Sequence, residues 1–147
     1  MSWSACCRDS RRVSCTAGGK PETFDLLGFT HYWGLSRNGK WVVKKRTAKD
    51  RFSRTLRRIN EWCRTHRHDD VEVQHRALAR KLNGHYAYFG VTSNYSALAK
   101  LWHETKAIWR KWLSRRSQRA FVNWDAMHRL LERFELPRPR IVHRHGT

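Results

Sequence analysis

Hydrophobic and polar positions follow two different periods along this chain. From residue 24 to residue 45, aromatic and β-branched residues form two runs, and the pair Asn38-Gly39 lies between them. An Asn-Gly pair supplies two residues of positive φ to a tight turn, so the pattern predicts a small β-hairpin with strands at 24–33 and 41–45. From about residue 47 onward the period becomes 3.6 residues, which is typical of amphipathic helices.

The first helix is expected from about residue 48 to residue 64. Thr47 and Asp50 have the spacing of a capping box at its start, with Asp in place of the usual Glu or Gln. The positions that follow separate into an apolar side and a basic side, as on an amphipathic helix. The apolar side is expected to hold Phe52, Leu56, Ile59 and Cys63.

A second helix is expected to start near residue 71. The polar loop before it ends in Asp69 and Asp70, which are suited to cap its first turn. At Gly84 this helix either stops or continues through Phe89, and the sequence leaves both possibilities open.

Two more helices complete the expected bundle. The turn at 90–94 ends in residues that can cap a third helix, and a fourth helix is expected at about 123–134. Pro137 terminates the fourth helix, because proline cannot continue the helical hydrogen-bond ladder. The third helix has a broad apolar face, and we interpret its tryptophans as core residues. This face holds Leu98, Leu101, Trp102, Thr105, Ile108, Trp109, Trp112 and Leu113.

The predicted fold class is therefore mainly α, with a small N-terminal β-hairpin followed by a bundle of about four helices. Residues 1–18 mix Ser, Cys and Arg without any period and are expected to form a disordered leader. The hairpin region then covers 19–46, the helical domain 47–136, and a basic tail 137–147.

Charge points to the class of partner. The 147 residues include 31 Lys and Arg against 12 Asp and Glu, a formal net charge of +19. Such an excess destabilises a compact state by self-repulsion unless a polyanion neutralises it, so nucleic acid is the first candidate partner and an anionic membrane surface the second. No apolar run is long enough to span a membrane, and the N-terminus has no apolar core of secretory-signal length. We therefore expect a cytoplasmic protein with no membrane partner and with reduced cysteines.

Basic residues concentrate at the end of the hairpin, on the first two helices and around the end of the third. A helix can lay such a face along a phosphate backbone, and arginine fits phosphate with two parallel hydrogen bonds. A merely solvated face is the structural alternative. The predicted RNA-binding residues are Lys44, Lys45, Arg46, Lys49, Arg54, Arg57, Arg58, Arg80, Lys81, Lys111, Arg115, Arg116 and Arg119.

Other residue types offer weaker candidates for a site. Tyr86 and Tyr88 are candidates for stacking on bases, although packing in the core is the interpretation that their position favours. Asp69-Asp70 is better suited to cap a helix than to bind a metal ion, because its neighbours are basic and it lies in a polar loop. No metal, cofactor or catalytic residue is predicted.

Several segments together resemble one family. Residues 23–31 resemble the last palm motif of bacterial group II intron reverse transcriptases, and the resemblance continues through Trp41-Val-Val-Lys-Lys and Thr47-Ala-Lys. A box with Gly84, Tyr86 and Tyr88, followed by Trp-Arg-Lys-Trp at 109–112 and by residues 137–143, resembles the maturase-specific domain. The order and spacing of these boxes, over about residues 19–145, carry the resemblance.

The resemblance implies a truncated thumb and maturase region, in a bacterial cytoplasm, that grips group II intron RNA and a template–primer duplex to assist splicing. The fingers, the palm and its Asp-Asp metal site have no counterpart here, so the chain is not expected to be an enzyme by itself. Two alternatives remain open. The chain could complete a split RNA-directed DNA polymerase together with a separate fingers–palm fragment, or it could be a non-functional remnant of a mobile element. A DNA-binding regulator is less favoured, since no separate recognition helix is evident.

Overall fold

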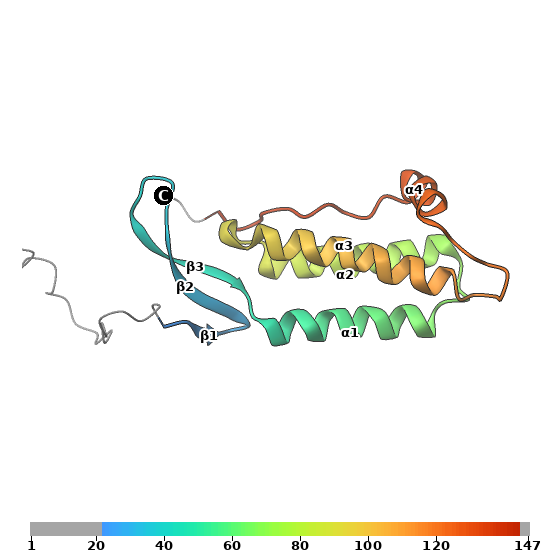
Figure 1. The fold of residues 1–147 in the computed structure, drawn as a ribbon, viewed down its shortest axis with the longest axis horizontal. Coiled ribbons are helices and arrows are strands. Elements are labelled where there is room, and N and C mark those ends of the chain that lie inside the picture. The colour runs from blue at the N-terminus through green and yellow to red at the C-terminus, as the bar shows by residue number, and fades with distance from the viewer. Residues whose placement is uncertain (1–21, 145–147) are drawn as a thin grey trace, which may run out of the picture.

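The computed structural model describes residues 22–144, and the predicted leader at 1–18 lies outside this range (Figure 1). A small sheet precedes the helices, which confirms the predicted fold class. In chain order the elements are β1 (Phe24–Leu26), β2 (Phe29–Leu35), β3 (Trp41–Thr47), α1 (Lys49–Thr65), α2 (Val71–Phe89), the short 3₁₀ helix η1 (Thr92–Asn94), α3 (Tyr95–Leu113) and α4 (Trp124–Arg133).

The sheet has three antiparallel strands in the order β1-β2-β3, because the first predicted strand is divided in two. The division falls at Leu27-Gly28, where both residues have positive φ values, 52° and 82°. This is the arrangement expected at Asn38-Gly39, but there only Gly39 has a positive φ, of 72°. The amide of Gly39 donates to the carbonyl of Ser36 at 3.1 Å, so a wider loop joins β2 to β3. The prediction of two positive-φ residues at Asn38-Gly39 was therefore wrong.

Asn94 joins the sheet to the helices. Its Oδ1 accepts a hydrogen bond from the amide of Thr47 at 2.8 Å, and its Nδ2 donates to the Thr47 hydroxyl and to the carbonyl of Phe89. The side chain is fully buried, so each of these bonds satisfies a group that water cannot reach. The capping box predicted at Thr47 is consequently absent: Ala48 is the N-cap of α1, and no side chain caps it.

The predicted helix boundaries agree closely with the structure, whereas most of the predicted caps do not. Helix α2 continues through Gly84 to Phe89, which settles the possibility that the sequence left open. Asp70 and Asn94 are the N-caps of α2 and α3, but neither side chain makes a capping hydrogen bond. At α4 the cap is formed, since the Asn123 side chain accepts from the amide of Ala126 at 2.8 Å.

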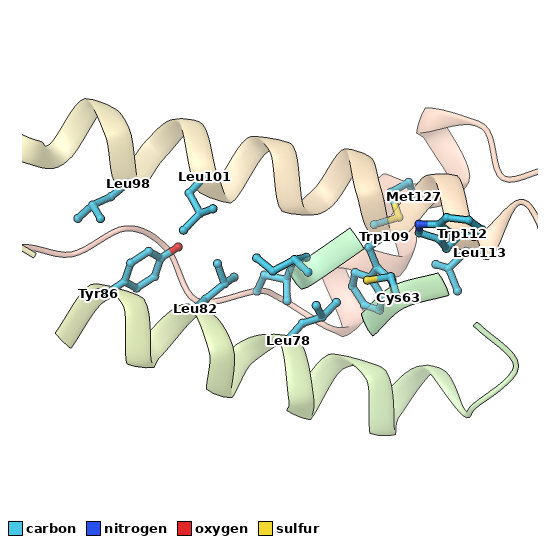
Figure 2. Close-up of a cluster of buried hydrophobic side chains, with 12 residues drawn as sticks. Cys63, Leu78, Leu82, Tyr86, Leu98, Leu101, Trp109, Trp112, Leu113 and Met127 are labelled. Atoms are coloured by element: carbon cyan, nitrogen blue, oxygen red, sulfur yellow. The ribbon is translucent and has the colours of Figure 1, made fainter. Parts of the chain in front are cut away.

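The core lies between the helices, and α2 and α3 turn their apolar side chains toward each other (Figure 2). Trp109 is fully buried, and its indole N–H donates to the Gln74 side-chain oxygen at 2.8 Å. The Gln74 amide nitrogen in turn donates to two carbonyls of the α1–α2 loop. Trp112 donates to the Asn60 side chain of α1 at 2.9 Å. The interpretation of the α3 tryptophans as core is confirmed for Trp109 and Trp112, and Trp102 packs partly buried against the same cluster.

The segment after α4 returns along the bundle toward the sheet (Figure 1). The Tyr86 hydroxyl donates to the carbonyl of Pro137 at 3.1 Å, and the amides of Val142 and His143 both donate to the carbonyl of Gly90 at 2.8 Å. A Cβ atom on Gly90 would lie 2.3 Å from the carbonyl oxygen of Tyr86, so only glycine fits there. The predicted basic tail thus lies against the bundle up to residue 144 and ends beside the base of the sheet. We use this term for the end of the sheet that lies next to the helices.

Candidate nucleic-acid interface

Helix α1 carries the main basic surface because its two sides differ so strongly in polarity. Ile59 and Cys63 are buried at 3% and 2% exposure, and the predicted Arg54, Arg57 and Arg58 are all exposed. Burial in this apolar side of the helix raises the pKa of the Cys63 thiol to about 12, so the thiol stays protonated and uncharged. The charged residues lie on the opposite side of α1, which faces solvent.

Arg51 belongs to the same surface and was missed from the sequence. Residues three and four apart are neighbours on a helix, so the spacing of Arg51, Arg54 and Arg58 aligns all three along α1. Arg51 is exposed, and its side chain passes close to Gly28 in the turn between β1 and β2. The i, i+3, i+7 spacing was the signal that would have identified it.

The predicted cations form no ion pairs with other residues of the range 22–144. In the part of the chain that the structure describes, the ion pairs are Glu61–Arg64, Glu72–Arg76 and Glu135–Arg138, all of them exposed and local in sequence. None of the predicted RNA-binding residues takes part in these pairs. Their positive charge is therefore available to an external anion.

Arg58 of α1 and Lys81 of α2, predicted separately, line one cleft of about 270 Å³. Its other lining residues are Thr55, Ile59, His85 and Leu101, so three helices meet there. The Lys81 ammonium also lies 5.4 Å from the centre of the Trp62 ring, which holds its side chain near α1. The cleft combines two cations with an apolar floor, a composition suited to an anionic group attached to an apolar or planar body.

His85 also lines this cleft and is a titratable residue that burial holds uncharged. Burial lowers the pKa of its imidazole to about 4, and its Nε2 has no hydrogen-bond partner among residues 22–144. The ring stacks on Phe89 with the ring centres 4.5 Å apart. A buried polar atom without a partner is uncommon, and here it belongs to a residue that lines the cleft. Arg80, one residue before Lys81, is exposed but does not line it.

The cations of β3 divide between the two faces of the sheet, because side chains alternate along a strand. Lys45 lines a second pocket, at the base of the sheet, of about 320 Å³. Lys44 lies on the other face with its aliphatic chain against Gly34, and the Arg46 guanidinium lies 5.6 Å from the centre of the Tyr32 ring. Lys49 is exposed at the start of α1.

The remaining predicted cations lie at the end of the bundle opposite the sheet (Figure 1). Lys111 and Arg115 both approach the Trp112 ring, at 5.3 Å and 5.4 Å from its centre. Arg116 is half-buried and donates to the main-chain carbonyl of Asp69, so part of its hydrogen-bonding capacity holds the α1–α2 loop, and its contact with RNA stays a prediction. Arg119 is exposed in the segment before α4.

The two tyrosines predicted to stack on bases have different surroundings. Tyr86 is fully buried, and burial raises the pKa of its hydroxyl, so the favoured interpretation of core packing is confirmed for this residue and it is no longer a candidate for stacking on an external base. Tyr88 is 51% exposed and lines the pocket at the base of the sheet. Its hydroxyl donates to the carbonyl of Leu27 at 2.9 Å, and its ring remains accessible.

Acidic and histidine side chains do not gather in the described range. Among residues 22–144, no group of three or more His, Cys, Asp and Glu side chains could hold a metal ion. Asp69 contributes its main-chain carbonyl to Gln74, and the His143 ring contacts the carbonyl of Ala87. Within the same range, no helix has both the length and the apolarity to cross a membrane.

Comparison with protein-family models, with curated proteins and with solved structures gives no match to this chain. Any functional assignment therefore rests on the chain's own residues and geometry.

Proposed function

We propose that this chain binds structured RNA as a maturase-type module, without a chemical step of its own. The observation that carries the proposal is the exposed cationic surface of α1, continued across the cleft by Lys81 of α2. Within the described range 22–144, its arginines Arg54, Arg57 and Arg58 form no ion pair. The resemblance to group II intron maturases names group II intron RNA as the partner. The net charge of +19 supports a polyanion of some kind.

A basic helix is better suited to bind the phosphates and the shape of folded RNA than to read the edges of its bases. Double-stranded RNA is gripped mainly through its phosphates, 2′-hydroxyls and shape, since its major groove is too narrow for side chains. Helix α1 has 17 residues and is therefore about 26 Å long, which is enough to follow several phosphates. Arg54, Arg57 and Arg58 would each release condensed counterions on contact, so affinity would fall steeply with salt.

The test compares a group II intron RNA with an unstructured RNA of equal length over a salt series. We expect tighter binding of the intron at physiological salt. Replacing Arg54→Ala, Arg57→Ala and Arg58→Ala together should weaken binding and reduce the slope of log K against log salt by up to about three, or about one per lost phosphate contact.

A second triple variant serves as the matched control: Arg64→Ala, Arg76→Ala and Arg138→Ala. It removes the same formal charge from arginines that already face a glutamate. We expect its salt slope to stay close to that of the unmodified protein. Equal losses in the two triple variants, or equal binding of both RNAs, would leave only general cationic attraction and would contradict the proposal.

A further inference from the structure

One face of the sheet exposes an unusual set of aromatic side chains. The register pairs Trp33 with Val43, Leu35 with Trp41 and Phe24 with His31. Because side chains alternate across a sheet, these three pairs lie on the same face. Phe24 is 56% exposed, Trp33 39% and Trp41 64%. We call the surface formed by Phe24, Trp33 and Trp41 the aromatic face.

Only the inner end of this side of the sheet is covered by the bundle. Phe29 packs against Phe89 and Tyr88, with ring centres 5.0 Å and 5.8 Å apart. Beyond this contact, β2 and β3 extend past the ends of the helices (Figure 1). Trp33 and Trp41 lie on this extension, so their exposure is a consequence of the fold.

The charge around the two tryptophans of the aromatic face is positive, although Glu22 and Asp25 flank Phe24 at its other end. Residues 29–47 contain no Asp or Glu, and their cations are Arg37, Lys40, Lys44, Lys45 and Arg46. Lys45 lies on the same face as the tryptophans, directly opposite His31. An occupant of this surface should therefore combine apolar or planar groups with negative charge, which disfavours a second copy of this cationic chain.

The aromatic face leads into the pocket at the base of the sheet. Tyr88, Lys45 and His31 are among the residues that line this pocket. His31 is buried, its Nδ1 has no hydrogen-bond partner within residues 22–144, and its ring stacks in parallel on Phe24, with the ring centres 4.8 Å apart. A continuous surface thus runs from Trp41 to Tyr88, and it contains aromatic rings, the Lys45 ammonium and the unsatisfied Nδ1 of His31.

We propose that the aromatic face binds single-stranded RNA, with unpaired bases stacked on Trp33 and Trp41 and the strand continuing toward the pocket at Tyr88. Every base has a π face, so aromatic side chains on a sheet hold single strands with little sequence preference, while nearby cations meet the phosphates. Trp33 and Trp41 are diagonal cross-strand neighbours, a relation that places Cα atoms about 7–8 Å apart. Each of the two rings can therefore stack on a separate base. The inference rests on the proposed RNA-binding function and adds a second element of the RNA, an unpaired segment, to the structured part held by α1.

The test measures binding of a fluorescently labelled single-stranded RNA of about eight nucleotides and of an RNA hairpin without unpaired ends. In the double variant Trp33→Leu and Trp41→Leu, we expect about 10- to 100-fold weaker binding of the single strand, because both stacking contacts are lost while the apolar strand residues remain. Binding of the hairpin should change less than about twofold, and the salt slope should not change, since no phosphate contact is removed.

Two control variants make the result specific. Trp124→Leu removes a tryptophan that is 45% exposed on α4 and has the Arg110 guanidinium 4.5 Å from its ring centre, so single-strand binding should be unchanged. The variant Trp33→Phe with Trp41→Phe keeps both π faces and should retain most of the affinity. Circular dichroism of each variant confirms that the sheet and helices are intact.

Unchanged single-strand binding in the leucine variant overturns the inference, as does an equal loss for the single strand and the hairpin. A phenylalanine variant as weak as the leucine variant also overturns it. If sedimentation shows that the tryptophans hold two copies together, or vesicle flotation that they bind anionic lipid, while RNA affinity is unaffected, the face serves another partner. The α1 arginine variants fail or succeed independently, so failure of this inference is distinguishable from failure of the proposed function.

Discussion

The bundle and the sheet use the same large aromatic residue in opposite ways. In the bundle, Trp109 and Trp112 are buried, and each indole N–H donates to a side-chain oxygen of another helix. In the sheet, Trp33 and Trp41 are 39% and 64% exposed, on the part of one face that the bundle does not cover. The first pair specifies how the helices pack, whereas the second pair contributes little to the fold and is available to a partner.

The difference indicates that the bundle provides most of the stability of this molecule, whereas the sheet provides a surface for binding. In the bundle, the buried Gln74 side chain is satisfied internally, because it bonds to Trp109 and to the α1–α2 loop. The sheet has no core of its own, because three strands with one uncovered face bury little apolar surface. It is held to the bundle by Asn94 and by the packing of Phe29 on Phe89.

The largest predicted effect tests this separation with one substitution in each region. Trp109→Ala should lower the free energy of unfolding by about 3–5 kcal/mol, since it leaves a cavity and removes the partner of Gln74. Trp41→Ala should lower it by only about 0.5 kcal/mol, because the ring is already mostly in water. Urea denaturation followed by circular dichroism measures both changes.

Similar losses of stability in these two variants would contradict the comparison. A large effect of Trp41→Ala would mean that the sheet face is packed in solution, against the bundle or against another chain. Repeating the measurement at several protein concentrations distinguishes these cases, since only association makes stability depend on concentration.

A smaller predicted effect concerns the pH dependence of the free energy of unfolding, and it arises in the bundle. Burial lowers the pKa of His85 to about 4, whereas in the unfolded chain it returns to its ordinary value of 6.5. Between these values the unfolded state binds more protons than the folded state, so stability falls as the pH is lowered from about 6.5 toward 4. From pH 7.5 to pH 5, the contribution of His85 to the free energy of unfolding should fall by about 2 kcal/mol.

His85→Phe isolates this contribution, because phenylalanine can keep the stacking on Phe89 and cannot take up a proton. The unfolding free energy of this variant should depend less on pH between 7.5 and 5. The matched substitution His128→Phe replaces an exposed histidine of α4 and should retain the pH dependence of the unmodified protein. Identical pH profiles for all three proteins would show that His85 is not held neutral by the fold.

Helix positions could be predicted from the sequence, but most of their caps could not. The 3.6-residue period located α1 and α4 to within one residue, because burying one apolar side of a helix repeats a signal every turn. The caps failed at Thr47 and Asn94 because these two side chains bond to each other across 47 residues of sequence. A local motif contains no information about such a distant partner.

The candidate site was predictable in its composition but less so in its arrangement. The arginines of α1 were found because a charged run on an amphipathic helix must face water. Sequence alone could not show that Lys81 meets Arg58 in one cleft or that Arg116 donates to the loop at Asp69. The exposure of Trp41 was equally hidden, because it depends on how far the sheet extends beyond the helices.

The smallest predicted effect lies in the sheet and has the opposite sign. Leu27 has a φ of 52° in the turn before β2, a conformation that costs leucine about 1–2 kcal/mol but that asparagine adopts readily. Its side chain is 75% exposed, so little packing is lost on replacement. Leu27→Asn creates an Asn-Gly turn with Gly28 and should raise the free energy of unfolding by about 0.5–1 kcal/mol.

Amide hydrogen exchange is the measurement that assigns this gain to a region. If the sheet opens separately from the bundle, Leu27→Asn should slow exchange at the strand amides of β1 and β2 and leave those of α2 and α3 unchanged. Asn38→Leu at the other turn is the matched control: Asn38 does not have positive φ there, so this change should not produce the strain that Leu27 carries. Slower exchange throughout the bundle in Leu27→Asn would mean that sheet and helices unfold as one unit, and the stability of the two regions could then not be separated.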